Sequence, residues 1–165
     1  MSVSKSRLYK AVVYTTAGTF TIRLNSSSAP VTVNNFVFLA KHSFYHCVIF
    51  QRVIPGFVVQ GGDPTGTGEG GPGYVFTDEL PKRNNTGITY PLYSVAMANT
   101  GIANSNGSQF FIVVGKKAET LTPKYSLFGQ VVSGQNAVMR IANEGSAGGT
   151  PKVIERILGV RIVEG

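Results

Sequence analysis

The chain carries the sequence FQRVIPGFVVQGGD at residues 50–63 and a second dense segment, VAMANTGIANSNGSQFF, at residues 95–111. Each segment sets one strong hydrogen-bonding side chain, Arg52 in the first and Asn99 in the second, among apolar residues in a strand-like context. A shallow apolar pocket needs this combination to hold a peptide and to polarise one of its amides. Together, the two segments predict a peptide-binding pocket built on β-strands.

Around these segments, short β-rich runs recur along the whole chain. Two such runs, at 9–15 and 19–24, are separated by Thr16-Ala17-Gly18, a spacing that suits an antiparallel hairpin with a glycine in its turn. Further strands are predicted at 48–53, 57–60, 93–98, 110–114, 126–132 and 153–163.

Two segments have helical periodicity. Pro30 suits the first turn of a helix that ends near Lys41, and apolar residues recur within it at steps of three and four, namely Val33, Phe36, Val37 and Ala40. A second, shorter helix fits residues 135–143, where the apolar side chains lie on one side. Each helix is therefore predicted to pack one apolar face against a core.

Many short strands with few helices predict a mainly β fold, either a closed antiparallel barrel or a sandwich. A closed barrel removes the sheet edges, and the interior of an eight-stranded barrel is just filled by side chains. We therefore predict a closed eight-stranded antiparallel barrel capped by two α-helices. At 165 residues, without repeat or linker, the chain is predicted to be a single domain, 1–165, in which residues 1–7 form a loose N-terminal extension.

Composition argues against several classes of protein. The single cysteine, Cys47, rules out an intrachain disulfide, and its apolar neighbours predict a small buried residue rather than a nucleophile. No stretch approaches the roughly 18 apolar residues of a membrane span. Because residues 1–10 also lack the apolar core of a secretory signal, we expect a cytoplasmic protein without membrane contact, and a trimmed form of an exported precursor stays open as the alternative.

Basic residues outnumber acidic ones, 15 to 8, which gives a net charge of +7. The basic residues are scattered, and the longest runs are the pairs Lys82-Arg83 and Lys116-Lys117, without the interleaved aromatic residues of a base-stacking surface. This pattern predicts a solvated basic surface and no nucleic-acid partner. A nucleic-acid-associated scaffold stays open as an alternative, marked by a steep loss of binding as salt rises.

Two other motifs predict no cofactor or metal. Residues 66–71 match G-x-G-x-x-G, but Pro72 follows at once, so the helix of a dinucleotide-binding unit cannot begin there, and a surface loop close to a groove is expected instead. His42 and His46 are four residues apart but lack the further ligands of a zinc site. With no other histidine, a catalytic triad lacks a credible base.

The two segments quoted at the outset, in this order and at this separation, resemble the signature of the cyclophilin family. The resemblance covers nearly the whole chain, from the hairpin near Tyr9 to the last strand at 153–163. It implies a cyclophilin-like barrel with the ligand groove outside its wall. It also implies a monomeric peptidyl-prolyl cis-trans isomerase, or rotamase, that acts as a chaperone in protein folding. Its partners would be proline-containing peptides and unfolded or flexible protein segments, without a cofactor.

The resemblance implies a role for each residue of the site. Arg52, in the pattern Phe-x-Arg-x-x-x-Gly-Phe, matches the catalytic arginine of the family, Gln60 matches the glutamine that helps to position it, and the Asn99 backbone would hold the residue before the proline. The substrate-binding residues would be an apolar cup for the proline ring (Phe57, Val58, Phe111 and Leu121, with Tyr125 on its wall), the flanks of Asn99 (Ala98 and Thr100), and a neighbouring pocket (Gln109 and Gly66).

The chemistry of this reaction suits the residues present. Rotation about an X-Pro bond meets a barrier of about 18 to 20 kcal/mol, and no bond breaks during the rotation. A catalyst therefore needs no nucleophile, metal or general base, but must bind the twisted amide better than either planar form. A guanidinium stays charged and can donate to the imide nitrogen as that nitrogen becomes pyramidal. Arg52 is the candidate for this role.

The chain departs from the family pattern at three places. Gln51 stands where most members have a histidine, residues 118–120 replace a rim that in many members includes a tryptophan, and Tyr125 replaces a histidine found in many members. Because the missing indole would supply a donor and a large apolar wall, we expect cyclosporin-type inhibitors to bind with reduced affinity. A non-catalytic proline-peptide binding module or scaffold stays open as an alternative function.

Overall fold

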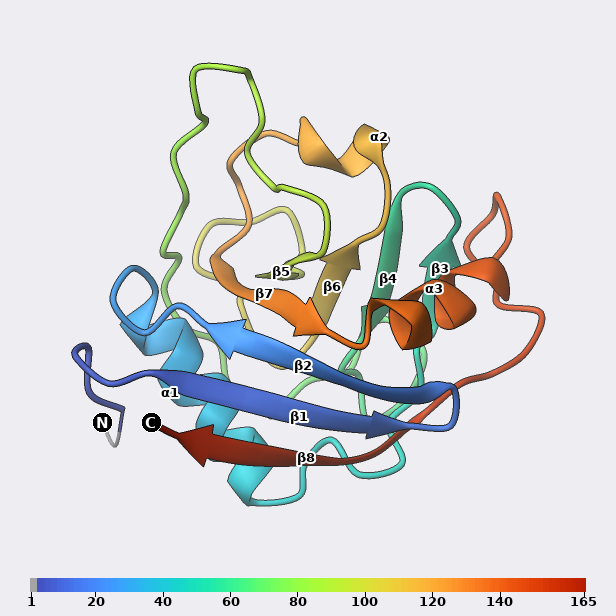
Figure 1. The fold of residues 1–165 in the computed structure, drawn as a ribbon, viewed down its shortest axis with the longest axis horizontal. Coiled ribbons are helices and arrows are strands. Elements are labelled where there is room, and N and C mark those ends of the chain that lie inside the picture. The colour runs from blue at the N-terminus through green and yellow to red at the C-terminus, as the bar shows by residue number, and fades with distance from the viewer. Residues whose placement is uncertain (1–2) are drawn as a thin grey trace.

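The computed structural model describes residues 3–165, in which eight strands and three helices are found (Figure 1). In chain order these are β1 (Tyr9–Thr15), β2 (Gly18–Leu24), α1 (Pro30–Lys41), β3 (Arg52–Ile54), β4 (Val58–Gly61), β5 (Ser94–Met97), β6 (Phe110–Val113), α2 (Lys116–Glu119), β7 (Leu127–Ser133), α3 (Gln135–Asn143) and β8 (Ile157–Glu164). The long segment between β4 and β5 contains no strand or helix.

The strands form one antiparallel sheet in the order β3-β4-β6-β5-β7-β2-β1-β8, which curls into a half-barrel. Its edges meet outside the named strands, where Ile49 forms an isolated bridge with Arg156. Backbone bonds from Phe50 N to Glu155 O (3.0 Å) and from Ile157 N to Val48 O (2.8 Å) reinforce this contact. The predicted eight-stranded antiparallel fold is therefore confirmed, and a short bridge joins its two edges.

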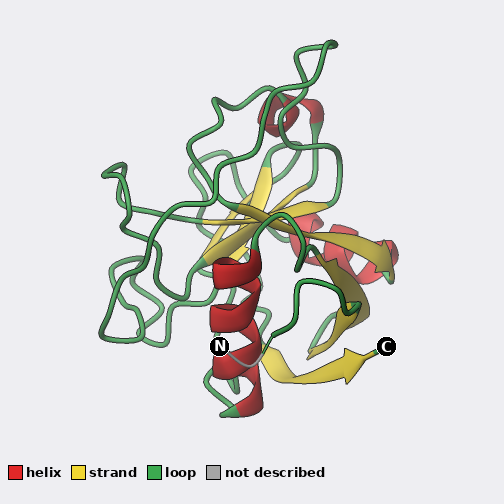
Figure 2. Ribbon diagram, turned by 90° about the vertical axis from the view of Figure 1, so that its left-hand side faces the viewer, coloured by secondary structure: helices red, strands yellow, loops and turns green. Residues whose placement is uncertain are grey.

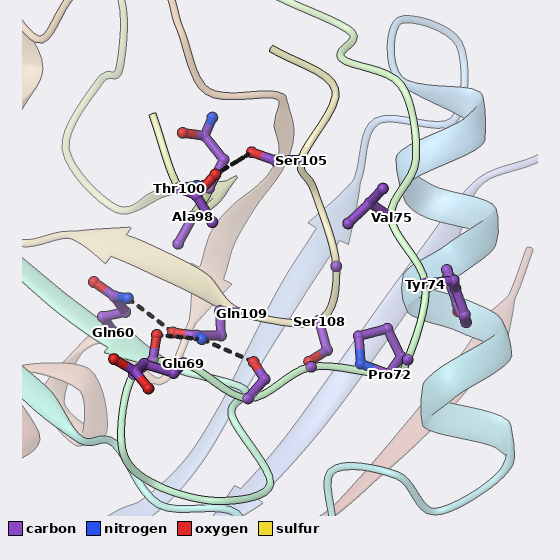
Figure 3. A pocket seen from close by; sticks show the side chains of 16 residues that line it. Gln60, Glu69, Pro72, Tyr74, Val75, Ala98, Thr100, Ser105, Ser108 and Gln109 are labelled. Atoms are coloured by element: carbon purple, nitrogen blue, oxygen red, sulfur yellow. Dashed lines mark hydrogen bonds between the residues drawn. The ribbon is translucent and has the colours of Figure 1, made fainter. Parts of the chain in front are cut away.

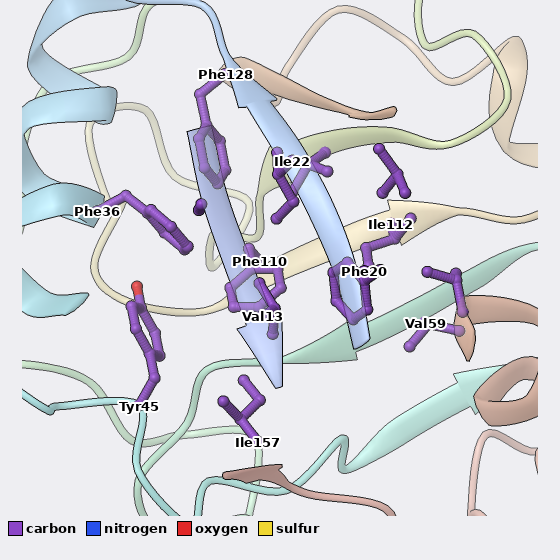
Figure 4. Packing of buried hydrophobic residues seen from close by; sticks show 14 of the residues in the cluster. Val13, Phe20, Ile22, Phe36, Tyr45, Val59, Phe110, Ile112, Phe128 and Ile157 are labelled. Carbon is purple, nitrogen blue, oxygen red and sulfur yellow. The ribbon is translucent and has the colours of Figure 1, made fainter. Parts of the chain in front are cut away.

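Aromatic side chains fill the inside of the curled sheet (Figure 4). Phe36 of α1 lies with its ring centroid 5.1 Å from that of Tyr45, 5.2 Å from that of Phe128 and 5.8 Å from that of Phe110. Pairs at these separations add to the stabilisation that burial alone provides. Because the interior is packed with side chains, a ligand must bind on the outer surface of the sheet.

The helices cover separate parts of the sheet. Helix α1 packs beside β8, whereas α3 packs beside β2, β3 and β4, and the views in Figures 1 and 2 show the two helices well apart. Helix α2 was not predicted, because a single turn of four residues is too short to show an apolar period. Among residues 3–165, no helix combines the length and hydropathy that crossing a bilayer requires.

Most element boundaries agree with the sequence-based ranges to within a few residues, but two local predictions need correction. The strand expected at 48–53 begins only at Arg52, because residues 48–50 find their backbone partners at 155–157 rather than on β4. Cys47 is exposed, not buried. Its φ of 62° turns the chain between Tyr45 and Val48, so those two neighbours are buried while Cys47 faces outward.

The N-terminal extension lies partly outside the described residues, which exclude 1–2. Within the described part, Val3 is buried and its amide donates to Asn34 Oδ1 at 3.3 Å, while residues 4–7 form no helix or strand. The loose extension at 1–7 and the single-domain organisation stay predictions.

Helix α1 begins with a cap from a distant segment. Its N-cap residue, Ala29, has no capping side chain. Instead, Glu79 Oε1 accepts from Val31 N (3.1 Å), and Glu79 Oε2 accepts from Thr32 N and Thr32 Oγ1 (2.8 Å each). The carboxylate satisfies unpaired amides and lies at the positive end of the helix dipole. Because Glu79 lies between β4 and β5, its carboxylate joins this segment to α1. Its main-chain N donates to Ser126 Oγ at 2.8 Å, which ties the same residue to the start of β7.

We expect the Glu79→Ala substitution to lower the free energy of unfolding by about 1 to 2 kcal/mol, because it removes a helix cap and a favourable charge. Urea denaturation would measure the change. Glu79→Gln, which keeps one acceptor oxygen but no charge, should fall between the wild type and the alanine variant. Equal midpoints for wild type and Glu79→Ala would contradict the capping role.

Candidate functional site

Three adjoining cavities lie on the outer surface of the sheet. The central one has a volume of about 180 Å³, and the structure gathers in its wall most of the residues predicted from the sequence: Arg52, Phe57, Val58, Gln60, Ala98, Asn99, Phe111, Leu121 and Tyr125. Thr100 and Gln109 line a larger neighbour of about 670 Å³, and Gly66 lines a third cavity of about 340 Å³. All three share Gln60, so the predicted residues form one continuous groove, although their roles stay predictions.

Strand register explains why these side chains share a face. Arg52 of β3 pairs with Gln60 of β4, and Gln60 pairs with Phe111 of β6. Directly paired residues of antiparallel strands point to the same side of the sheet. Their neighbours Val53, Val59 and Ile112 point the other way and are fully buried in the interior. The alternation thus sends apolar residues inward and the candidate functional residues outward.

The apolar cup has its own small core. Tyr90, fully buried behind the cup, donates its hydroxyl to Tyr125 O (2.8 Å) and accepts from Tyr125 N (2.9 Å). The Phe111 and Tyr125 rings meet edge to face, with centroids 5.3 Å apart. Burial, partly offset by its hydrogen bonds with the 124–125 backbone, raises the pKa of Tyr90 to about 12, so its hydroxyl remains a donor. No motif or periodicity pointed to Tyr90 as a supporting residue.

Arg52 is free to act on a ligand. Its Nη1 donates to Gln60 Oε1 at 3.4 Å, and its guanidinium carbon lies 5.9 Å from the centroid of the Phe57 ring. Both ion pairs found among residues 3–165 involve Glu164, so no carboxylate of the described chain neutralises Arg52. An exposed, unpaired guanidinium beside an apolar cavity can donate a charge-assisted hydrogen bond to a bound group.

Asn99 uses its side chain to shape the backbone. Its Nδ2 donates to Lys124 O (2.8 Å), and its Oδ1 accepts from Gly101 N (2.9 Å). No hydrogen bond within residues 3–165 engages the main-chain N–H and C=O of Asn99. A strand-like peptide laid along the groove could therefore bond to this backbone, because a free donor and acceptor beside a sheet can receive an extended chain.

A glycine-rich loop borders the groove, and Asp63 holds it in place. Asp63 Oδ1 accepts from Thr65 N and Thr65 Oγ1 (2.7 Å each), while Oδ2 accepts from Gly68 N (2.6 Å) and Gly70 N (3.1 Å). A Cβ at Gly70 would lie 2.0 Å from Asp63 Oδ1, so only glycine fits there. Asp63 ends the first quoted segment but was assigned no role from the sequence. The predicted surface loop near a groove is what the structure shows.

Gln109 connects this loop to the centre of the groove (Figure 3). Its Nε2 donates to Gly68 O and Gly70 O (2.9 Å each), and its Oε1 accepts from Gln60 Nε2 (3.1 Å). Gln51 Nε2 also donates to Gln109 Oε1 (2.9 Å). Sequence reasoning noted Gln51 only as a departure from the family and assigned it no role.

The described residues contain no group of three histidine, cysteine or acidic side chains able to hold a metal ion. His42 Nδ1 bonds to Phe38 O at 2.8 Å, and His46 Nδ1 bonds to Leu158 O at 2.7 Å. Both imidazoles therefore serve local backbone contacts away from the groove.

Comparison with known proteins gives consistent results. The sequence model of a family described as cyclophilin type peptidyl-prolyl cis-trans isomerase/CLD matches residues 11–162. Peptidyl-prolyl cis-trans isomerase A of Mycobacterium tuberculosis is 41% identical over 168 residues, which cover 89% of this chain and 90% of the relative. Peptidyl-prolyl cis-trans isomerase-like 1 of Aspergillus oryzae is 41% identical over 157 residues, which cover 91% of this chain and 92% of the relative.

Solved structures point the same way. The crystal structure of a cyclophilin type peptidyl-prolyl cis-trans isomerase from Cryptosporidium parvum superposes with a TM-score of 0.85 at 30% identity, covering 94% of this chain and 98% of that chain. A second structure of that protein, in the presence of the dipeptide Ala-Pro, gives a TM-score of 0.83 at 30% identity, covering 93% and 98%.

Asp63 generates a prediction about pH. Burial alone would raise the pKa of Asp63, but hydrogen bonds from Thr65, Gly70 and Gly68 outweigh burial and lower this pKa below its ordinary 3.8. The carboxylate therefore stabilises the fold fully above pH 3.8, and this contribution is lost as the pH falls through the lower, folded-state value. Asp63→Asn should lower the free energy of unfolding by about 1 to 3 kcal/mol at neutral pH.

Denaturation of the wild type and of Asp63→Asn as a function of pH would test this prediction. The difference between their free energies of unfolding should narrow below pH 3.8. Glu69→Gln, in the same loop but exposed, is the matched control and should behave as wild type. A difference between wild type and Asp63→Asn that stays constant over the whole pH range would contradict the role of the ionised carboxylate.

Proposed function

The chain belongs to the cyclophilin-type peptidyl-prolyl cis-trans isomerase family, and from this premise we propose that it isomerises X-Pro bonds in the cup beside Arg52. It is thus an enzyme of the isomerase class. The observation that supports this site is the Arg52 guanidinium, which has no ion-pair partner among the described residues and lies at the rim of an apolar cavity.

In the proposed mechanism, the proline ring enters the cup and the main chain of Asn99 bonds to the residue before it. The cavity volume of about 180 Å³ is below that of a site for a drug-sized ligand, so it suits a single side chain or ring. Arg52 then donates to the imide nitrogen as the amide twists and the nitrogen lone pair becomes available. Gln60 keeps the guanidinium over the bond that rotates.

A rate gain on the order of 10⁵ would require about 7 kcal/mol of preferential binding to the twisted amide. One charge-assisted hydrogen bond supplies roughly 1.5 to 3 kcal/mol, so Arg52 alone cannot account for it. The remainder would come from the oriented backbone at Asn99 and from the apolar cup, where exclusion of water strengthens each polar contact.

Proline-containing peptides are the proposed substrates. The structure of the Cryptosporidium parvum relative in the presence of Ala-Pro supports this choice, because that protein has the same fold over nearly its whole length. The larger cavity beside Asn99 would receive peptide side chains that precede the proline. A monomeric state and a cytoplasmic location stay predictions.

We expect Arg52→Ala to lower kcat/KM at least tenfold while the protein remains folded, because the variant loses a charge-assisted hydrogen bond made in the transition state. A proline-peptide isomerisation assay would measure the loss, and circular dichroism would verify the fold. Arg23→Ala, which removes an exposed arginine from β2, is the control and should behave as wild type. Wild-type turnover by folded Arg52→Ala would exclude Arg52 from the mechanism.

Cyclosporin-type inhibitors should bind weakly while small proline peptides are still turned over. The rim before Leu121 consists of helix α2, in which Ala118 is buried, and its exposed C-cap residue Thr120, so it offers no large aromatic wall. Inhibition should therefore require micromolar or higher concentrations. Thr120→Trp should tighten inhibition by about tenfold by adding an aromatic surface and a donor. Nanomolar inhibition of the wild type would contradict this expectation.

A further inference from the structure

We propose that Gln51 and Gln109 are positioning residues that fix the amide orientation of Gln60 and, through it, the guanidinium of Arg52. The inference rests on the proposed function and names side chains that act one step behind the reacting groups. It follows from the direction in which each amide in the groove donates its hydrogen bonds.

The direction is set at the glycine-rich loop. Gln109 faces Gly68 O and Gly70 O, each at 2.9 Å. Carbonyl oxygens only accept, so the atom of Gln109 that faces them must be Nε2, the donor. The loop itself is held, because the amides of the same two glycines donate to Asp63 Oδ2. The oxygen of Gln109 is therefore directed away from the loop and towards the groove (Figure 3).

Two amides converge on that oxygen. Gln51 Nε2 lies 2.9 Å and Gln60 Nε2 lies 3.1 Å from Gln109 Oε1. The two bonds use both acceptor positions of the oxygen. If Gln60 rotated its amide by half a turn, its own oxygen would face Gln109 Oε1, and a hydrogen bond would be replaced by a contact between two acceptors.

The orientation of the Gln60 amide decides whether its oxygen or its NH₂ group faces the Arg52 guanidinium. With Nε2 committed to Gln109, the Oε1 atom of Gln60 is left to accept from Arg52 Nη1 at 3.4 Å. The opposite orientation would present an NH₂ group to the guanidinium, and two donors cannot bond. Every bond from Arg52 to the loop thus runs in one direction, an arrangement in which each bond strengthens the next.

Gln51 holds its place at a cost. Its own Oε1 is buried and has no hydrogen-bond partner among the described residues. A buried unpaired carbonyl is unfavourable. The Gln51 side chain therefore leaves its acceptor unsatisfied in the orientation that lets its Nε2 donate to Gln109. Gln51 lines the third cavity but not the central one. Gln51 shares this third cavity with Arg52, so a charge placed at position 51 can also act on the guanidinium directly, and Gln51→Met, which adds no charge, isolates the route through Gln109 and Gln60.

The decisive variant is Gln51→Glu, which is nearly the same size but cannot donate when ionised. Its carboxylate would face Gln109 Oε1 with no proton between the two acceptors, and the repulsion would displace Gln109 Oε1 from Gln60 Nε2 and loosen the orientation of Gln60. At pH 8 we expect kcat to fall about tenfold with KM little changed. As the pH is lowered through the pKa of this carboxyl, it regains a proton that it can donate to Gln109, and kcat should recover.

Other charged groups around the network must be separated from this effect. Arg52 keeps its charge over the whole range, and Asp63 has a lowered pKa. Glu69 is exposed in the same loop, and Glu155, beside the bridge to Ile49, accepts from the Thr16 hydroxyl. The pH profiles of wild type and of Gln51→Met, which removes the donor without adding a charge, account for the titration of these groups.

Rates measured by NMR exchange on a proline tetrapeptide would give kcat and KM for each variant, with Arg52→Ala beside them. Reduced kcat in Gln51→Met at every pH, together with pH-dependent recovery in Gln51→Glu, supports the proposal. Wild-type kcat in Gln51→Glu, a loss that does not recover with acid, or a wild-type kcat in Gln51→Met would overturn it.

Failure of the positioning role and failure of the proposed function would give different results. If Arg52→Ala is slow but the Gln51 variants are not, only the positioning role is wrong; if Arg52→Ala turns over peptide as wild type does, both are wrong. Should the Gln51 variants fail to fold, hydrogen exchange in the wild-type protein still tests the proposal. The side-chain NH₂ protons of Gln109 should exchange slowly with solvent, because both are donated to loop carbonyls. Exchange as fast as for an exposed glutamine would overturn the proposal.

Discussion

Alternation of side chains across β3, β4 and β6 is the constraint on which the rest of the molecule depends. The residues of these strands that point inward, such as Val53 and Ile112, complete a core that has no room for a ligand. The residues between them necessarily point outward, and register places Arg52, Gln60 and Phe111 in one row. A shift of register by one residue would bury the guanidinium and expose the core. Fold stability and the chemistry of the groove are therefore specified by the same strand pairs.

The outer surface has to remain ordered without being part of the main core. A second, smaller cluster achieves this, with Tyr90 behind the cup and with Phe111 and Tyr125 packed edge to face. The long segment between β4 and β5 has no regular structure of its own, yet Glu79 ties it to α1 and Asp63 organises the glycine-rich loop within it. The groove is thus supported from behind by Tyr90 and by the carboxylates of Asp63 and Glu79, none of which lines its cavities.

The sequence predicts what local pattern and a long motif can specify. The range of β1, the limits of α1 and α3 and the gathering of the groove residues were all expected from periodicity, turn residues or family resemblance. What it could not predict depends on contacts between distant residues. Glu79 caps a helix 47 positions away, and the sheet edges meet through residues 48–50 and 155–157, for which no local pattern exists. The exposure of Cys47 depends on one backbone angle that apolar neighbours do not reveal.

Asp63 holds the glycine-rich loop mainly through main-chain amides, at Thr65, Gly68 and Gly70. Amides of the main chain are present whatever side chain a residue carries. The exposed Glu69 can therefore be replaced with little risk to the loop, while the wall of the groove changes its chemical character. A substitution there would alter the surface along the groove without disturbing the hydrogen bonds that hold the loop.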